Sequence, residues 1–140
     1  MNIVDQGLVF LGEHGSDFSS SCFHGLCILP QGRWLVGFRA AAKKGDALGQ
    51  RVAVTWSDDR GKTWSKTTCP FANRSIHGKA GAWRAGQPTA LGGSCVAMVL
   101  YWVDASDTGR PFFNEETEGL LDSRIFLTLS LDAGGTWSEP

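Results

Sequence analysis

The sequence predicts an all-β protein built from two four-stranded antiparallel units. Three observations lead to this prediction: an eight-residue stretch that occurs twice, alternating apolar residues ahead of each copy, and 18 Gly and six Trp among 140 residues without a sustained helical period. The hydrophobic share of 42% and the charged share of 19% are typical of a globular domain. We therefore expect many short strands joined by turns.

The repeated stretch spans residues 57–64 and 130–137. Both copies fit Ser-x-Asp-x-Gly-x-Thr-Trp, and a further Ser follows each copy. Five fixed positions that recur at one spacing indicate an internal repeat. The two copies are called the first repeat and the second repeat below.

Each repeat is expected to form a tight turn between two strands. The Asp of each copy, Asp59 or Asp132, can accept hydrogen bonds from backbone N–H groups two residues on. The Gly, Gly61 or Gly134, supplies the positive φ that a reversal needs. Apolar residues alternate ahead of both turns, which places one face of a strand against a core. These residues are Val52, Val54 and Trp56 before the first repeat, and Ile125, Leu127 and Leu129 before the second.

The first unit covers about residues 22–69. Four antiparallel strands in about 47 residues match the size of one β-propeller blade. The first two strands are expected to form a hairpin, because Pro30-Gln31-Gly32 is a turn sequence. The expected strands are 22–29, 33–38, 51–56 and a fourth near 63–68.

The second unit covers about residues 86–140, after an irregular linker at 70–85 that contains Pro70, Gly78 and Gly81. The repeats are 73 residues apart, which exceeds the blade period of about 40–50 residues. The linker and a polar excursion explain the excess, so we count two units. The expected strands begin at 88–91 and continue at 95–103 and 124–129, with the excursion at 104–122.

Charge and hydropathy narrow the classes of function. The net charge of −1 does not favour nucleic acid or an anionic membrane as a partner. No apolar run approaches the ~20 residues that span a bilayer. Residues 1–10 do not resemble a signal peptide, so the compartment is unknown and cytoplasmic by default.

The four cysteines, Cys22, Cys27, Cys69 and Cys95, do not have the spacing of a zinc site. Without an export signal, we expect them to be buried free thiols. The sequence therefore implies no metal and no cofactor.

The repeated stretch resembles the Asp box, or bacterial neuraminidase repeat, of the sialidase (neuraminidase) superfamily. In that family the box lies at the turn between the third and fourth strands of a propeller blade, away from the active site. The resemblance implies a six-bladed β-propeller of which this chain forms about the N-terminal third, a partial propeller. It also makes the apolar run 7–11 a candidate for the strand that closes the last blade.

The resemblance also suggests site residues. Sialidases use an arginine triad, a Tyr–Glu nucleophile pair and an Asp acid/base. Arg39 and the loop up to Asp46 are similar to the family's second arginine and its acid/base Asp, so both are catalytic candidates. His24, within Phe23-His24-Gly25-Leu26, stands where the family has an arginine. Histidine lacks the two-pronged donor of arginine, and we expect it to contact substrate.

Further candidates lie in the excursion. Glu115, Glu116 and Glu118 are candidates for the acidic wall that contacts substrate in the family. Each assignment has a structural alternative: a strand histidine bonded to a backbone carbonyl for His24, an exposed turn for Asp46, and a solvated loop for the glutamates. Tyr101, the one tyrosine, lies in an apolar strand and is expected in the core.

The resemblance implies a fragment or subunit of a glycoside hydrolase of the exo-α-sialidase type, acting on a glycan such as a sialoside. The chain lacks the nucleophile and most of the carboxylate clamp, so we expect it to be inactive alone. Two alternatives remain: a non-catalytic Asp-box module that binds carbohydrate or protein, and a self-assembling unit. In the second case, three copies in a homo-oligomer would complete six blades.

Overall fold

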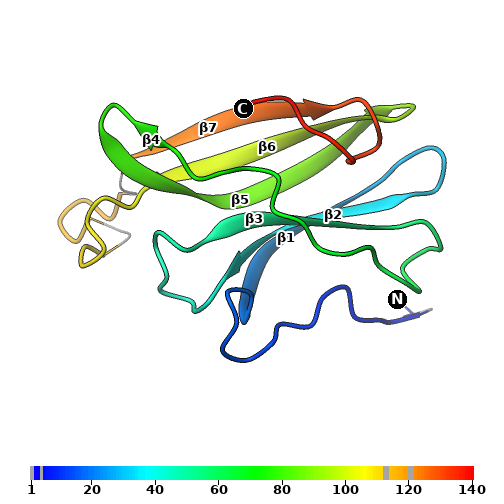
Figure 1. Cartoon of the computed structure of the whole chain (residues 1–140), viewed down its shortest axis with the longest axis horizontal. Coiled ribbons are helices and arrows are strands. Elements are labelled where there is room, and N and C mark those ends of the chain that lie inside the picture. Colours follow the sequence, from blue (N-terminus) through cyan, green and yellow to red (C-terminus); the bar gives the residue numbers. More distant parts are fainter. Residues whose placement is uncertain (1, 4, 112–113, 120–121) are drawn as a thin grey trace.

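The computed structural model describes residues 2–3, 5–111, 114–119 and 122–140. These residues form two antiparallel sheets and no helix, so the predicted all-β class is confirmed, and the described part has no helix that could cross a membrane. The first sheet has the order β1-β2-β3 and the second the order β4-β5-β6-β7 (Figure 1). The strands are β1 Ser20–Ile28, β2 Trp34–Ala41, β3 Arg51–Ser57, β4 Ser75–Ile76, β5 Lys79–Gly92, β6 Cys95–Asp104 and β7 Ser123–Ser130.

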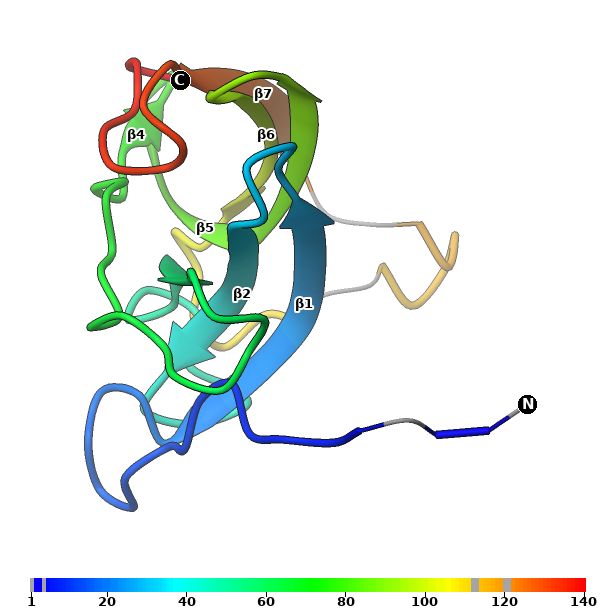
Figure 2. The same cartoon turned by 90° about the vertical axis from the view of Figure 1, so that its right-hand side faces the viewer.

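The two sheets pack face to face and bury a central core between them (Figure 2). Small residues allow the closest approach: a Cβ at Gly37 of β2 would lie 2.6 Å from the carbonyl oxygen of Gly86 on β5. Large side chains fill the space on either side of this contact. They include Leu35, Val52, Val54, Trp83, Met98, Leu100 and Trp102.

The other face of the first sheet is covered by the N-terminal segment. Val9 and Phe10 pack against Phe38, with the rings of Phe10 and Phe38 centred 5.1 Å apart. The run 7–11, which we expected as a closing strand, pairs with neither sheet in the described chain. It crosses the face of the sheet, where Val9 and Phe10 become partly buried while Leu8 and Leu11 stay exposed.

The other face of the second sheet is apolar and uncovered. Ile125 and Leu127 of β7 are 66% and 58% exposed, and no segment of the described chain lies over them. Leu91, Val99, Leu129 and Leu131 are also exposed, and this set of six residues is called the outer apolar face below. A surface of this kind usually marks a site of association.

Strand β5 begins at Lys79, inside the stretch 70–85 that we expected to be an irregular linker. Gly81 looked like a strand breaker in the sequence. In the structure, the indole of Trp102 lies over it, and a Cβ at Gly81 would be 2.0 Å from that ring. The glycine therefore makes room for a core side chain within a strand.

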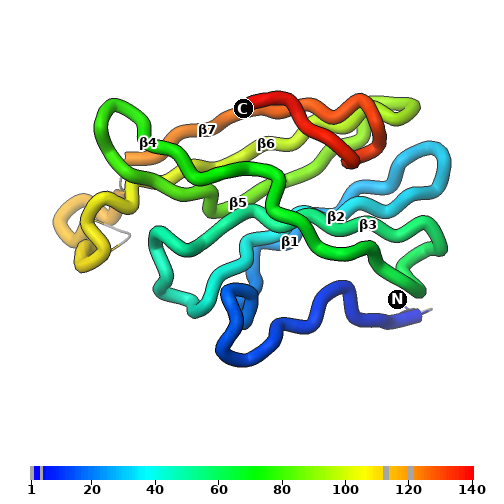
Figure 3. The backbone as a smooth tube through the Cα atoms, in the orientation of Figure 1, coloured from blue at the N-terminus to red at the C-terminus, as the bar shows by residue number. Residues whose placement is uncertain are grey.

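The fourth strand of each unit also differs from the expectation. After the first repeat the chain returns along β3 through a single bridge between Val54 and Thr68. After the second repeat, Ser138 N donates to Leu129 O at 2.8 Å. Figure 3 shows the segment after the first repeat crossing from the first sheet to the second, so it leaves β3 after a few residues.

Candidate functional site

The loops gather at two ends of the sheets. Both repeats lie at the right-hand end in Figure 1, while the loop 42–50 and the excursion lie at the left-hand end. The repeats hold their turns with local hydrogen bonds. The loop end contains a hollow lined by cationic side chains.

The first repeat is held by its aspartate. Asp59 Oδ1 accepts hydrogen bonds from Ser57 Oγ at 2.8 Å and Thr63 N at 2.9 Å, and Oδ2 accepts one from Thr63 Oγ1 at 2.7 Å. Ser57 Oγ in turn accepts a bond from Gly61 N at 2.8 Å. Both carboxylate oxygens are thus used inside the turn.

The second repeat has the same bonds. Asp132 accepts from Ser130 Oγ at 2.8 Å, from Thr136 N at 2.8 Å and from Thr136 Oγ1 at 2.7 Å. Hydrogen bonds from the backbone and hydroxyl of Thr63 and Thr136 lower the pKa of Asp59 and Asp132 to about 2. These carboxylates are turn-forming groups, and the described residues contain no cluster of three or more His, Cys, Asp or Glu that could hold a metal.

The cationic hollow opens at the other end, where β1 begins. Its volume is about 340 Å³, and no acidic residue is among the described residues that line it. Three of its lining side chains, from β2, the following loop and β5, carry positive charge. The lining residues are Ser20, Ser21, Cys22, Phe23, Arg39, Lys44 and Arg84.

A bulge in β1 shapes this hollow. The register between β1 and β2 shifts between Cys22 and Gly25, and Phe23 has a φ of 56°, which is unusual for a bulky residue. The guanidinium of Arg84 lies 5.2 Å from the Phe23 ring centroid, and Gln87 Nε2 donates to Phe23 O at 3.0 Å. A positive φ at a bulky residue is strained, so the contacts around Phe23 must hold it in this conformation.

Arg39 organises the loop beside the hollow. Its side chain is 2% exposed, and its Nε donates to Gln50 Oε1 at 2.8 Å. Its Nη2 donates to the carbonyl oxygens of Lys43, Lys44 and Asp46 at 3.1–3.3 Å. All these acceptors are neutral, so none of them cancels the positive charge of Arg39. Arg39 therefore holds the loop by hydrogen bonds, and its charge adds to the positive potential of the hollow.

Burial lowers the pKa of Arg84, and the positive charge of Arg39 lowers it further. Two guanidiniums are therefore close enough to repel each other, and an anion in the hollow would relieve that repulsion. The Tyr101 hydroxyl is buried and has no hydrogen-bond partner among the described residues.

The structure places the other candidates outside the hollow. The His24 ring stacks on Phe38, 5.8 Å between centroids, on the face of the first sheet that points away from Arg39. Asp46 Oδ1 accepts a hydrogen bond from Gly49 N at 2.7 Å, which closes the loop. Glu115 and Glu118 are exposed and do not line the hollow. Their functional roles stay predictions.

Sequence reasoning gave no role to Phe23 and no motif to Arg84. One signal was present: Arg84 is a charged residue in a strand whose neighbours are Ala, Gly and Trp. A long charged side chain at such a strand position does not serve core packing, which makes it a candidate for a functional site.

Sequence reasoning also missed an ion cluster at the root of the excursion. Asp104, whose side chain is 1% exposed, lies 3.1 Å from Arg110 Nη2 and 3.4 Å from Lys79 Nζ. Ser106 Oγ donates to it at 2.5 Å, and this bond is the main cause that lowers its pKa to about 2. The cluster fastens the excursion to β5 and β6.

No family model and no curated protein matches the chain. Among solved structures, the fold is that of a sialidase-like all-β domain. A matching structure is the Hadza microbial sialidase Hz136, with a TM-score of 0.61 and 19% sequence identity over 89% of this chain. The chain spans 26% of the length of that protein.

Proposed function

We propose that the chain is part of a sialidase-like glycoside hydrolase, in which the two sheets are blades of a β-propeller and the repeats are Asp boxes. The sialidase-like fold and the Ser-x-Asp-x-Gly-x-Thr-Trp sequence of both turns support this proposal. In this proposal the first unit stays near 22–69, the second unit begins with β5 at Lys79 and not at residue 86, and the completed ring acts on a glycan.

The cationic hollow is the proposed site for a carboxylate of that glycan. The observation that carries this assignment is the convergence of Arg39, Lys44 and Arg84 on one hollow with no acidic lining residue. Arg84 and Lys44 would supply charge-assisted hydrogen bonds, and the buried charge of Arg39 would raise the local potential. The Phe23 ring holds the Arg84 guanidinium by stacking, which reduces the entropy lost on binding.

The chain by itself is proposed to bind without hydrolysis. Asp46 would act as the acid/base through Oδ2, because its Oδ1 accepts the hydrogen bond from Gly49 N. His24, Glu115 and Glu118 would contact the more distant parts of the glycan. The nucleophile would come from other blades.

The binding proposal is tested by titrating the chain with a methyl sialoside and with the methyl ester of the same sugar, followed by backbone NMR. We expect saturable shifts at 20–23 and 39–44 with the acid, and none with the neutral ester. Arg84→Gln and the more exposed Lys44→Gln should each weaken binding roughly tenfold. Arg124→Gln is the matched control, because Arg124 is an exposed arginine that pairs with Asp122 outside the hollow.

Equal binding of acid and ester would contradict the carboxylate site. Release of a fluorescent aglycone from a sialoside tests the second part of the proposal. We expect no turnover by the chain alone. Turnover that Asp46→Asn abolishes would overturn the proposed inactivity and would support Asp46 as the acid/base.

We also propose that a further sheet packs on the outer apolar face. Its six exposed apolar side chains resemble the apolar inner face that already packs on the first sheet. The further sheet would come from more blades in a longer polypeptide or from other copies of this chain. Light scattering distinguishes the two: a mass of three chains supports self-assembly, and a monomer that binds a hydrophobic dye supports the longer polypeptide. A stable monomer that binds no dye would contradict both.

A further inference from the structure

A second pocket lies beside the first repeat, far from the cationic hollow along the sheets. It has a volume of about 440 Å³ and is formed where the N-terminal segment crosses the outer side of the first sheet. Its walls combine two indoles with a carboxylate, an amide and two cations. The lining residues are Asp5, Gln6, Gly7, Leu8, Trp34, Arg60, Gly61, Lys62 and Trp64.

Gly61 brings the two indoles to this pocket. A Cβ at Gly61 would lie 3.2 Å from the Trp34 ring and 3.6 Å from the Trp64 ring, so the backbone at this residue lies against both. Both indoles are half-buried, so each keeps some of its surface accessible. An indole that is fixed on one side and exposed on the other is a stacking surface for an apolar ligand face.

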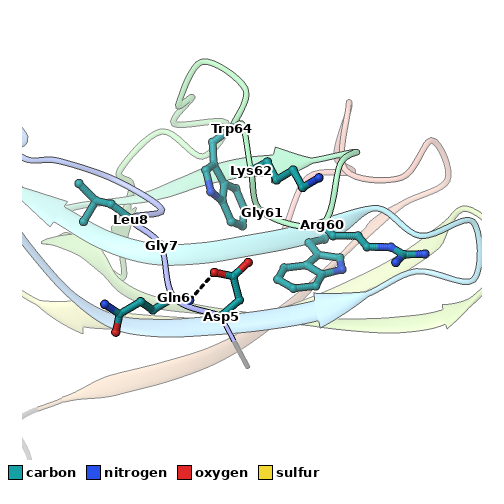
Figure 4. Close-up of a pocket in the computed structure, with 9 residues that line it drawn as sticks. Asp5, Gln6, Gly7, Leu8, Arg60, Gly61, Lys62 and Trp64 are labelled. Carbon is teal, nitrogen blue, oxygen red and sulfur yellow. Dashed lines mark hydrogen bonds between the residues drawn. The ribbon is translucent and has the colours of Figure 1, made fainter. Parts of the chain in front are cut away.

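Polar groups face the same space from opposite walls. Asp5 lines the pocket from the N-terminal segment, and Lys62 and Arg60 line it from the first repeat, with their side chains extending away from Asp5 in Figure 4. Asp5 Oδ1 accepts a hydrogen bond from Gln6 N at 2.8 Å, which fixes the carboxylate and leaves Oδ2 for a further donor. The pocket therefore offers acceptors on one wall and cations on the other.

The second repeat shows that these cations are not needed for the turn. Its residues at the positions of Arg60 and Lys62 are Ala133 and Gly135, yet its internal hydrogen bonds are the same. Arg60 and Lys62 are therefore a feature of the first repeat that the turn geometry does not require.

We infer that this pocket is a binding site for a saccharide that carries a carboxylate. A sugar ring has a flat face of C–H groups that stacks on an indole, and hydroxyl groups at its edge that donate to a carboxylate such as Asp5. Lys62 and Arg60 would bind the sugar's own carboxylate. The two cations outnumber Asp5, so the pocket favours an acidic sugar over a cationic ligand. The inference does not depend on the proposed function of the cationic hollow.

The experiment titrates the full chain with a glucuronate-containing tetrasaccharide and with cellotetraose as a neutral match. Indole N–H resonances are followed by NMR, because Trp34 and Trp64 line this pocket and no Trp lines the cationic hollow. We expect both indole signals to shift with the acidic sugar. Lys62→Gln should weaken that binding roughly fivefold and Asp5→Asn somewhat less.

Two exposed lysines give a matched control. Lys66→Gln removes the same charge just after the first repeat, outside the pocket, and should leave binding unchanged. Trp34→Leu should abolish the shift of Trp64, and its fold is checked by the dispersion of the backbone spectrum. Since Lys62 and Asp5 are exposed, their variants test the inference even if Trp34→Leu does not fold.

Three results would overturn the inference: unchanged Trp34 and Trp64 signals at millimolar sugar, equal binding of cellotetraose, or the same loss with Lys66→Gln as with Lys62→Gln. If sialoside titrations still shift residues 20–23 in that case, the cationic hollow stands and only this second site is lost. Conversely, shifts at the two indoles without shifts at 20–23 would support the second site and leave the cationic hollow without support.

Discussion

The two repeats have the same internal hydrogen bonds but different surroundings. In both, the residue before the Gly has a positive φ, 62° at Arg60 and 59° at Ala133. The first repeat is partly open and borders the saccharide pocket. The second packs one corner into the core, where Ala133 is 7% exposed and Gly134 lies against Leu35. The fixed positions build the turn, and the variable positions decide what the turn faces.

One side chain joins the two repeats. Arg33, in the β1–β2 hairpin, donates to both carboxylate oxygens of Asp58 at 2.7 and 2.8 Å, and to Ala133 O at 3.3 Å. Its guanidinium also lies 5.3 Å from the ring centroid of Trp56. The repeats are 73 residues apart in sequence, and this arginine ties them at the same end of the sheets.

Replacing the repeat glycines should give the largest loss of stability and the largest difference between the two repeats. Gly134→Ala adds a Cβ 2.7 Å from Leu35 Cδ1 at a φ of 92°, so we expect a loss of about 3 kcal/mol from strain and overpacking. Gly61→Ala places its Cβ no closer than 3.2 Å to the Trp34 ring and 3.6 Å to the Trp64 ring, so it should lose about 1–2 kcal/mol. Urea unfolding measures both, and equal losses would contradict the difference in burial.

Replacing the repeat aspartates should have the next largest effect on stability, and the effect should be equal in the two repeats. The pKa of each is lowered in the folded state, so their stabilisation is present above pH 4 and is lost as the pH falls from about 4 to about 2. Asp59→Asn and Asp132→Asn should lower the melting temperature at pH 7 by similar amounts. Each should also reduce the slope of melting temperature against pH between pH 2 and 4.

If Asp59→Asn and Asp132→Asn lower the melting temperature by unequal amounts, the surroundings of each turn contribute to the strength of the aspartate hydrogen bonds. Asp122→Asn serves as a comparison, because Asp122 pairs with Lys79 and Arg124 at the opposite end, and hydrogen bonds from these cations lower its pKa. Its effect should fall with added salt, whereas the repeat aspartates bond neutral donors and should respond little to salt.

Removing the link between the repeats should have a smaller effect. Arg33→Met keeps an apolar side chain against Trp56 but loses the ion pair, and we expect a loss of about 1 kcal/mol because Asp58 is exposed. Thermal unfolding in low and high salt measures it. No change at low salt would show that the repeats are held by the core alone.

The smallest effect should follow from exchanging a variable position. Arg60→Ala places in the first repeat the residue that the second has at the same φ, so stability should change by less than about 0.5 kcal/mol. Chemical denaturation checks this. A larger loss would show that Arg60 stabilises the turn, and it would weaken the proposal that Arg60 binds a ligand.

The position of the repeat turns was predictable because their bonds connect residues at most four positions apart, as from Ser57 to Gly61. The bonding partner was not: we expected each aspartate to accept from an N–H group two residues on, whereas Asp59 accepts from Thr63, four residues on. The start of β5 was not, because the role of Gly81 depends on Trp102, which is distant in sequence. A glycine that ends a strand and a glycine that admits an indole look the same in a single sequence. The all-β class needed only the local signals.

The cationic hollow was predictable only in part. Arg39 was a candidate, but its partners in the loop 43–46 show that it is a buried organiser of that loop. The contact between Phe23 and Arg84 depends on the bulge in β1 and on how the two sheets pack against each other. No local sequence pattern specifies the bulge or the packing. A site built from three elements requires their packing to be known.

The contact between Gly37 and Gly86 limits how the two sheets can move. The inner-facing neighbours of Gly37 along β2 are Leu35 and Arg39, so sliding one sheet by two residues would drive a large side chain into the Gly86 carbonyl. Shear between the sheets is therefore blocked at this point.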